Sequence, residues 1–213
     1  MYLSGEEIFK RRDELFPDIS LFDKAHLQEA SYDLRLGEQV FLSDQKTPLQ
    51  LSDDNPFVVI PPGEFALLMS YEKISVPRTL IGFITIRLKY KLQGLINVSG
   101  FHVDPRYSGH LIFSVQNVGP NDIRLFYKSE PVFTVFWAEV KGEIPAGVEK
   151  KGPRKSHNRI SGEQMSQLGG GSVTLGTLKR DIETLDHIVK VYAPILIALF
   201  LSILGLLISR TFR

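Results

Sequence analysis

Short apolar stretches alternate with turn residues along the first 140 positions of the chain. The stretches are rich in β-branched and aromatic side chains, and clusters of Gly, Pro, Asn and Asp separate them. Several short strands at this spacing are typical of an all-β barrel or sandwich. The pattern predicts strands over residues 57–60, 64–69, 80–86, 110–116 and 132–140.

A short helix is expected ahead of these strands. Ser4 and Glu7 have the spacing of a capping box, which satisfies free amide groups at the start of a helix. The predicted helix runs to about Arg12. Residues 1–140 are therefore expected to form one mainly β domain with a helical N-terminus.

The composition changes after Val140. Residues 141–171 are rich in Gly, Pro, Ser and charge, which indicates a linker, or an arm that becomes ordered only on a partner. Basic side chains gather within it and could stay solvated, or attract anionic lipid head groups or the phosphates of a ligand. These side chains are Lys150, Lys151, Arg154, Lys155 and Arg159.

A helical pattern begins after residue 171. Its apolar positions lie 3, 4, 3 and 4 residues apart, as in the seam of a coiled coil. The seam fills residues 172–190, and a short parallel oligomeric stalk explains it most simply. An amphipathic helix that packs on the chain's own barrel is the alternative. The seam positions are Leu175, Leu178, Ile182, Leu185 and Val189.

Residues 191–209 carry no charge and are mostly Leu, Ile, Val, Ala and Phe. A helix needs about 20 such residues to cross the hydrocarbon core of a bilayer, and a buried core helix would show a polar face or a shorter apolar run. We predict one transmembrane helix. One of its faces carries small residues that would let neighbouring helices approach closely: Ala198, Ser202, Gly205 and Ser209.

Composition and charge indicate where in the cell the domain lies. The net charge of +1 indicates no nucleic-acid partner by itself, and the absence of cysteine excludes disulfides and fits a reducing compartment. The N-terminus lacks the basic and apolar regions of a signal peptide. Lys179, Arg180 and Lys190 precede the apolar helix, which favours the cytosol for that side. We expect a cytosolic N-terminal domain with a single-pass C-terminal membrane anchor.

Common catalytic and metal-binding motifs are missing. The five histidines show no HxxxH spacing, and the sequence contains neither a P-loop nor a GxSxG elbow. We therefore expect no resident metal and no cofactor.

Three segments resemble one family, the dCTP deaminases, which are relatives of dUTPase. Residues 29–37 (EASYDLRLG) are similar to a family signature, residues 62–82 are similar to its PGE…L…E…lP…l.G run, and residues 104–117 are similar to its DPGysG…N segment. The order and separation of the segments agree over residues 1–140. The resemblance implies a mainly β, dUTPase-like distorted barrel. It also implies a trimer with nucleotide sites at subunit interfaces, although the heptads would equally permit a tetramer.

The chain departs from this family at positions that matter for catalysis. The Arg-Ser-Ser motif of the family is Arg87-Leu88-Lys89 here, and Ser114 stands where the resemblance places the proton-shuttling glutamate. A serine hydroxyl cannot replace a carboxylate as general base unless another base activates it. The dUTPase reaction needs an aspartate that holds the attacking water. Between residues 97 and 104 the only acid is Asp104, which the resemblance identifies as a structural turn residue. We lean towards a protein that is not an enzyme, with Mg²⁺-nucleotide as cofactor only if it is one.

Loss of the chemistry does not remove binding, because guanidinium and ammonium groups hold phosphate whether or not catalysis follows. Aromatic side chains could stack on a base, although aromatic residues of a β-barrel commonly belong to its core; Tyr90, Phe101 and Tyr107 are the candidates. The residues nominated for phosphate or nucleotide binding are Arg87, Lys89, Lys91, Arg106, Tyr107 and Arg124.

Three functions are compatible with these features. The leading hypothesis is a membrane-anchored, non-catalytic sensor of a nucleotide or short oligonucleotide. Its output could be the opening of an oligomeric pore in antiviral defence, with a nucleotidyltransferase as a partner. The antiviral context is an analogy with other systems. The alternative is a membrane-anchored dCTP deaminase or dUTPase of deoxynucleotide metabolism. The third is a scaffold in which the barrel only forms an oligomer.

Overall fold

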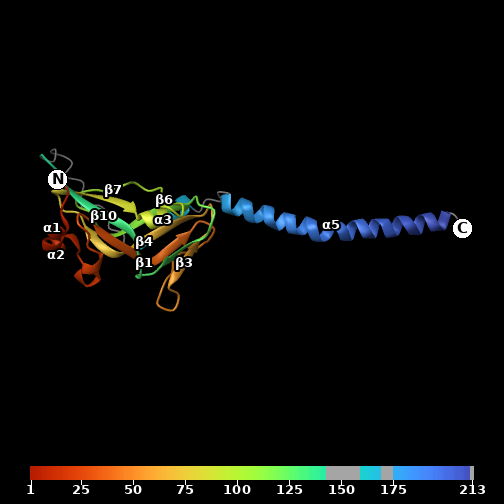
Figure 1. The fold of residues 1–213 in the computed structure, drawn as a ribbon, viewed down its shortest axis with the longest axis horizontal. Coiled ribbons are helices and arrows are strands. Elements are labelled where there is room, and N and C mark those ends of the chain that lie inside the picture. Colours follow the sequence, from red (N-terminus) through yellow and green to blue (C-terminus); the bar gives the residue numbers. More distant parts are fainter. Residues whose placement is uncertain (143–158, 169–174, 212–213) are drawn as a thin grey trace. The chain divides into compact units, whose positions relative to one another are not determined.

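The computed structural model describes residues 1–142, 159–168 and 175–211 of the chain. It forms two separate units, Met1–Ser172 and Val173–Arg213, and each is described by itself. Figure 1 labels the elements of both.

The first unit begins with two short helices. Helix α1 spans Gly5–Lys10, and its N-cap is Ser4, whose Oγ accepts a hydrogen bond of 3.2 Å from the Glu7 N–H. This confirms the predicted helix start. Helix α2 (Arg12–Leu15) follows directly, and two single turns, η1 (Ile19–Leu21) and η2 (Lys24–His26), lead to the first strand.

Strands dominate the described residues from Tyr32 to Glu139, as the alternation of apolar stretches and turn residues predicts. Strands β3 and β5 match the expected ranges residue for residue, and β4, β8 and β10 match them with shifted ends. The sequence analysis did not delimit β1, β9 or the short strands. The ten strands are β1 (Tyr32–Leu42), β2 (Leu49–Gln50), β3 (Phe57–Ile60), β4 (Phe65–Ser75), β5 (Leu80–Ile86), β6 (Leu95–Asn97), β7 (His102–Val103), β8 (Ser108–Asn117), β9 (Ile123–Phe126) and β10 (Pro131–Glu139).

The strands form one curled antiparallel sheet and one small two-stranded antiparallel sheet. The large sheet has the order β6-β8-β4-β1-β10-β5-β7, with β2 on the edge of β1, and β3 pairs only with β9. Its inner face encloses the main core around Trp137, Tyr32 and Phe113. Figure 1 shows these strands gathered in one body with α1 and α2 at one end. The mainly β expectation is confirmed.

The pairing of β4 is irregular against both of its neighbours. Against β1 the register shifts between Leu36 and Val40 of β1, and against β8 it shifts between Met69 and Lys73 of β4, where β4 bulges. The Ser70 hydroxyl replaces part of the lost ladder, since it donates to the Glu72 carbonyl at 2.7 Å and accepts from the Leu111 N–H at 2.9 Å. Gly37 is needed opposite the bulge, because a Cβ there would stand 2.6 Å from the Ser70 carbonyl oxygen.

A helix lies inside the segment that the composition predicts to be a linker. Helix α4 spans Gly162–Leu168. Just before it, Ile160 is buried against Phe41 and Leu67 in a second hydrophobic cluster, which is separate from the main core. The sequence analysis missed this helix because so few of its residues are apolar that it shows no helical periodicity. Part of the expected arm is thus ordered by the chain's own barrel.

The described residues of the second unit form one continuous helix, α5 (Leu175–Thr211), which joins the ranges expected for the stalk and for the membrane segment. Among the described residues, one helix is long and apolar enough to cross a membrane, and its candidate span is Asp181–Gly205. None of that span is buried within the chain. The predicted long apolar C-terminal helix is therefore present.

Candidate functional site

The residues of the altered Arg-Ser-Ser motif lie on a short helix at the end of β5. Arg87 has an extended backbone, with φ −64° and ψ 145°, and helix α3 (Leu88–Lys91) starts directly after it. The Arg87 N–H donates to the Val132 carbonyl at 2.9 Å, which holds the start of the helix against β10. The turn of α3 therefore sets the directions of Arg87, Lys89 and Lys91.

Arg87 makes an ion pair with a buried carboxylate. Its Nη1 lies 3.3 Å from Oδ2 of Asp33, whose side chain is 5% exposed. The other oxygen of Asp33 accepts a hydrogen bond of 2.7 Å from the Thr134 hydroxyl. The Arg87 guanidinium compensates a charge taken out of water, while its outer part is accessible to a further anion.

Lys89 and Tyr90 both contact Glu130, at the start of β10. Lys89 forms an ion pair with this carboxylate, and the Tyr90 hydroxyl donates to it at 3.2 Å. The hydrogen bond from Lys89 lowers the pKa of Glu130, whereas burial, followed by the Glu130 charge, raises the pKa of Tyr90 to about 12. Tyr90 is 1% exposed, so it belongs to the core and is not available to stack on a base.

A hollow of about 480 Å³ opens between the end of β5, α3 and the segment that joins β6 to β7. Its polar side chains are those of Thr85, Lys91, Asn97 and Ser99, and Ile96 and Phe101 are among its apolar walls. None of the described residues that line it is an aspartate or a glutamate. The hollow combines one cation, one amide and two hydroxyls with apolar surface, a lining suited to an organic anion.

Ser114 is hydrogen-bonded to the segment that lines this hollow. Its N–H donates to the Ser99 Oγ at 3.3 Å, and its carbonyl accepts from the Val98 N–H at 2.7 Å. The Ser99 hydroxyl in turn donates to the Asn97 side-chain oxygen at 2.6 Å. The residue that replaces the expected glutamate therefore fixes the segment that borders the hollow, and it supplies no carboxylate there.

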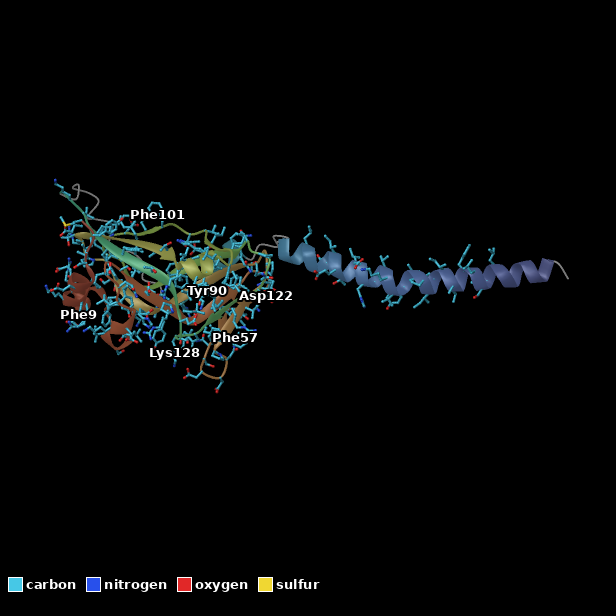
Figure 2. The ribbon with its side chains drawn as sticks, in the orientation of Figure 1. Phe9, Phe57, Tyr90, Phe101, Asp122 and Lys128 are labelled. Carbon is cyan, nitrogen blue, oxygen red and sulfur yellow. The ribbon has the colours of Figure 1, made fainter. Side chains whose placement is uncertain are left out.

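Phe101 is the aromatic candidate that remains available for stacking. It is 66% exposed, and its ring lies parallel to that of Phe83, 6.2 Å between centroids and 7° between planes. Figure 2 shows Phe101 at the edge of the domain. Phe101 also borders an apolar hollow of about 380 Å³ beside Tyr2 and Phe136.

The remaining nominated residues lie elsewhere in the single chain. The Arg106 N–H donates to the Val76 carbonyl at 2.6 Å, ahead of β5, so Arg106 and Arg87 stand at opposite ends of that strand. Tyr107 is 8% exposed and donates to the His110 carbonyl. Arg124 lies on β9, 4.7 Å above the ring of Phe57. Of the nominated residues, only Lys91 lines the hollow; Arg87 and Lys89 are next to it in the chain but pair with Asp33 and Glu130.

Sequence reasoning missed Asn97, Ser99 and the acidic partners of the cations. Asn97 and Ser99 lie in a segment whose only sequence signal is a Gly and a polar pair. Glu130 meets Lys89 from 41 positions further along the chain, a pairing that no local pattern indicates.

The residues nominated outside the barrel are only partly described. Lys150, Lys151, Arg154 and Lys155 lie outside the described residues, and Arg159 is exposed. All five stalk positions fall within α5, and Leu178, Ile182, Leu185 and Val189 are exposed in the single chain. The four small residues also fall within α5; Ala198, Ser202 and Gly205 are exposed, and the Ser202 hydroxyl donates to the Ala198 carbonyl at 2.9 Å.

Comparison with known proteins agrees with the resemblance seen in the sequence. The sequence model of a family described as dCTP deaminase-like matches residues 2–130. The dCTP deaminase of Pyrococcus abyssi is 29% identical over 152 residues, which cover 71% of this chain and 93% of that protein. The dUMP-forming dCTP deaminase of Corynebacterium efficiens is 28% identical over 194 residues, or 78% of this chain and 100% of that protein.

A solved structure shares the fold. The crystal structure of 2'-deoxycytidine 5'-triphosphate deaminase from Agrobacterium tumefaciens matches with a TM-score of 0.53 and 13% identity, and the match covers 64% of this chain and 48% of that one. The chain thus spans about half the length of that structure. At this identity the likeness establishes the curled, mainly β sheet and nothing beyond it.

Proposed function

The chain belongs to the dCTP deaminase-like family, and from that premise we propose that it is a membrane-anchored protein that binds a nucleotide or short oligonucleotide without deaminating it. Binding takes place in the barrel, and occupancy is passed to the membrane through helix α5. The observation that carries this proposal is the hollow beside α3, which has a cation and polar side chains but no carboxylate among its described lining residues.

The chemistry of deamination supports a non-catalytic barrel. Water must attack the carbon that bears the amine, and a group on the protein must take a proton from water and give one to the departing ammonia. Ser114, at the position of the expected glutamate, cannot do this at neutral pH, because its hydroxyl pKa lies far above 7. Binding needs none of these proton transfers, and Lys91, Asn97 and Ser99 are still present for it.

Helix α5 supports the membrane part of the proposal. Its apolar span is exposed along its whole length in the single chain, and that much exposed apolar surface calls for a lipid or protein partner. The domain before it faces the cytosol, as the charges that flank the helix favour.

Assembly of several chains completes the proposal. The seam of α5 packs against its copies as a parallel stalk, with three chains as the family resemblance implies, or four. The site residues that one chain leaves apart, Arg87 at one end of β5 and Arg106 at the other, then come from two neighbouring chains. The face with Ala198, Ser202 and Gly205 lets the membrane helices approach closely. Opening of a pore in antiviral defence, with a nucleotidyltransferase supplying the ligand, is the output that this arrangement would suit.

The second candidate is a membrane-anchored dCTP deaminase or dUTPase. The observation that favours it is the length of the similarity to two proteins named dCTP deaminases, which are matched over 93% and 100% of their own lengths. For this candidate another group must replace the missing glutamate, and Mg²⁺-nucleotide is the substrate form.

Thermal stability of the full chain in detergent micelles tests the binding. Deoxy- and ribonucleoside triphosphates and short oligonucleotides are added one at a time, and at least one should raise the melting temperature, since a ligand that binds the folded state stabilises it. The variant Lys91→Ala should show a smaller rise. Lys141→Ala, an exposed lysine away from the hollow, should behave as the wild type. If no ligand shifts the melting temperature, the scaffold function is the one that remains.

A further inference from the structure

One row of side chains crosses three strands on the outer face of the sheet. Phe41 on β1 pairs with Leu67 on β4, and Leu67 pairs with Ser114 on β8. Residues that are paired directly across strands point to the same face of a sheet. Ile112, two positions before Ser114 on β8, shares that face. The face that carries Ser114 is thus apolar on its β1 and β4 side.

The segment just before α4 covers this apolar part. Ile160 is 4% exposed and is buried with Phe41 and Leu67, while Met165 on α4 and Ile112 pack beside them. The Ile160 N–H donates to the Gln39 Oε1 at 2.9 Å, so the backbone is held to β1 as well. Ile160 is the one side chain of this segment that is fully buried in the cluster; its backbone hydrogen bond and the partly buried Met165 add to the anchor.

Helix α4 is closed at its start by its own side chains. The Ser161 N–H donates to the Gln164 Oε1 at 2.8 Å, and the Gln164 N–H donates to the Ser161 Oγ at 3.3 Å. This is a capping box, in which each partner satisfies a free amide of the other. A seven-residue helix is marginal by itself, so its stability depends on the anchor at Ile160.

The position of the anchor changes the length of chain between the two units. With Ile160 and α4 held on the barrel, six residues separate Leu168 from the start of α5 at Leu175, which reach about 20–25 Å when fully extended. Without the anchor, the connection starts at Gly142 and its 32 residues reach roughly 110 Å. Docking therefore decides how tightly motion of the barrel can constrain α5.

We propose that residues 159–168 are a latch: they dock on the Phe41–Leu67 face beside Ser114, and their docking and release couple the hollow in the barrel to helix α5. The contacts are continuous from the hollow to the latch. Ser99, in its lining, accepts from the Ser114 N–H; Ser114 pairs with Leu67; and Leu67 packs against Ile160. A ligand that moves the Asn97–Ser99 segment favours one of the two states of the latch. The role of the ligand rests on the proposed function, whereas docking itself does not.

Hydrogen exchange of the full chain in lipid nanodiscs, followed by mass spectrometry, tests docking without any ligand. Ile160→Ser should raise the exchange rate of the 162–168 amides about tenfold or more, because it removes the buried anchor. Two controls should leave that rate unchanged: Ile160→Val, which keeps an aliphatic anchor, and Val118→Ser, which makes a similar change at an exposed apolar position. An unchanged rate in Ile160→Ser overturns the latch.

The same measurement tests coupling in two ways. Ser99→Ala removes the acceptor of the Ser114 N–H and should change exchange at 162–168 at least threefold with no ligand present. In the wild type, a nucleotide that raises the melting temperature should likewise change the exchange rate of the 162–168 amides. If the amides of 162–168 respond to neither, the coupling is wrong even where binding is intact. If no nucleotide binds, the proposed function fails, and Ser99→Ala still decides the coupling.

Distances between spin labels test the predicted change in the length of the free connection. The sequence has no cysteine, so Asp54→Cys on the barrel and Asp181→Cys on α5 give a unique pair of sites for spin labels. Ile160→Ser should add distances longer than any in the wild-type distribution. Identical distributions would contradict a latch that limits the reach of the connection.

Discussion

Arg35 and Glu72 form a buried ion pair at the bulge of β4. The Arg35 Nε lies 2.6 Å from Glu72 Oε1, and the Arg35 N–H donates to Oε2 at 2.9 Å. The guanidinium also donates to the Leu21 carbonyl at 2.7 Å and lies 4.7 Å above the ring of Tyr71. Glu72 is fully buried, so one residue pair ties β1, β4 and the turn η1 together.

Removing one partner of this pair should destabilise the barrel strongly. Arg35→Met leaves the Glu72 carboxylate buried without a counter-charge, and a change of this kind costs about 3–5 kcal/mol. Urea unfolding followed by Trp137 fluorescence measures the loss. The matched control is Asp53→Ala, which breaks the exposed pair with Lys128 and should leave the urea midpoint where it is. If the free energy of unfolding of Arg35→Met falls by less than about 1 kcal/mol, the pair does not hold β1, β4 and η1 together.

The same carboxyl group makes a prediction about pH. Burial raises the pKa of Glu72 from 4.5 to about 6, although Arg35 acts in the opposite direction. The folded pKa exceeds the unfolded one, so this group stabilises the fold fully below pH 4.5 and loses its contribution, about 2 kcal/mol, as pH rises through 6. Urea unfolding from pH 4 to 7 should show this fall in the wild type and not in Glu72→Gln. Parallel curves for the two proteins would contradict it.

For individual residues, the sequence indicates which positions belong to the family segments but not which residues they contact. Arg35 and Glu72 both lie in segments that resemble the family, and the resemblance singled those segments out. Their contact joins positions 37 residues apart, which no local periodicity encodes. Tyr90 shows the same limit, since an aromatic residue on a four-residue helix could as well have faced the solvent.

At the scale of the elements, helix α3 and the β6–β7 segment decide what the hollow can hold. They supply Lys91, Asn97 and Ser99 to its lining, together with Phe101, which is exposed. Lys91 is the one cation among the described lining residues. The geometry of the site thus comes from two short elements that flank β5.

Phe101→Ala should weaken nucleotide binding. Stacking of a base on an aromatic side chain is worth about 1–3 kcal/mol, so Kd should rise roughly five- to 150-fold. Isothermal titration calorimetry of the full chain with the ligand found by thermal shift measures this. Phe126→Ala, at an exposed aromatic residue of β9, should bind as the wild type does. Equal affinity of Phe101→Ala and wild type would remove Phe101 from the site.

Strands were predictable because runs of β-branched and aromatic residues stand between clear turn signals, while α4 was not. Strands β3 and β5 are such runs, and their ends followed from the turns. Helix α4 depends on a tertiary contact, the docking of Ile160 on Phe41 and Leu67, and one apolar residue leaves no periodic signal. The bulge in β4 likewise follows from its two neighbours and not from its own sequence.

At the scale of the whole molecule, α5 is the feature that most separates this chain from a single compact domain. The charge-free run was sufficient to predict a long apolar helix, and the structure has one. Its crossing of a membrane and its packing with other copies depend on lipid and on further chains, so they remain proposals.

A charge in the middle of α5 tests the membrane anchor. Ile197→Arg should lower insertion into the bilayer, since an arginine at the centre of a transmembrane helix costs about 2.5–3.5 kcal/mol. Flotation with liposomes, followed by extraction in alkaline carbonate, should recover more of this variant than of the wild type in the soluble fraction. Val140→Arg, at an exposed position of the barrel, is the matched control. If Ile197→Arg and the wild type partition equally, α5 does not cross the bilayer.

The central claim is that the barrel binds a nucleotide and leaves it unchanged. Equilibrium dialysis of the full chain in detergent against a mixture of labelled nucleoside triphosphates that includes dCTP and dUTP, with chromatographic identification of the label on both sides, tests it most directly. The account predicts that at least one nucleotide is retained by the protein and recovered intact. Recovery of the label from dCTP as a uracil nucleotide, release of pyrophosphate from dUTP, or retention of none of the nucleotides would contradict it.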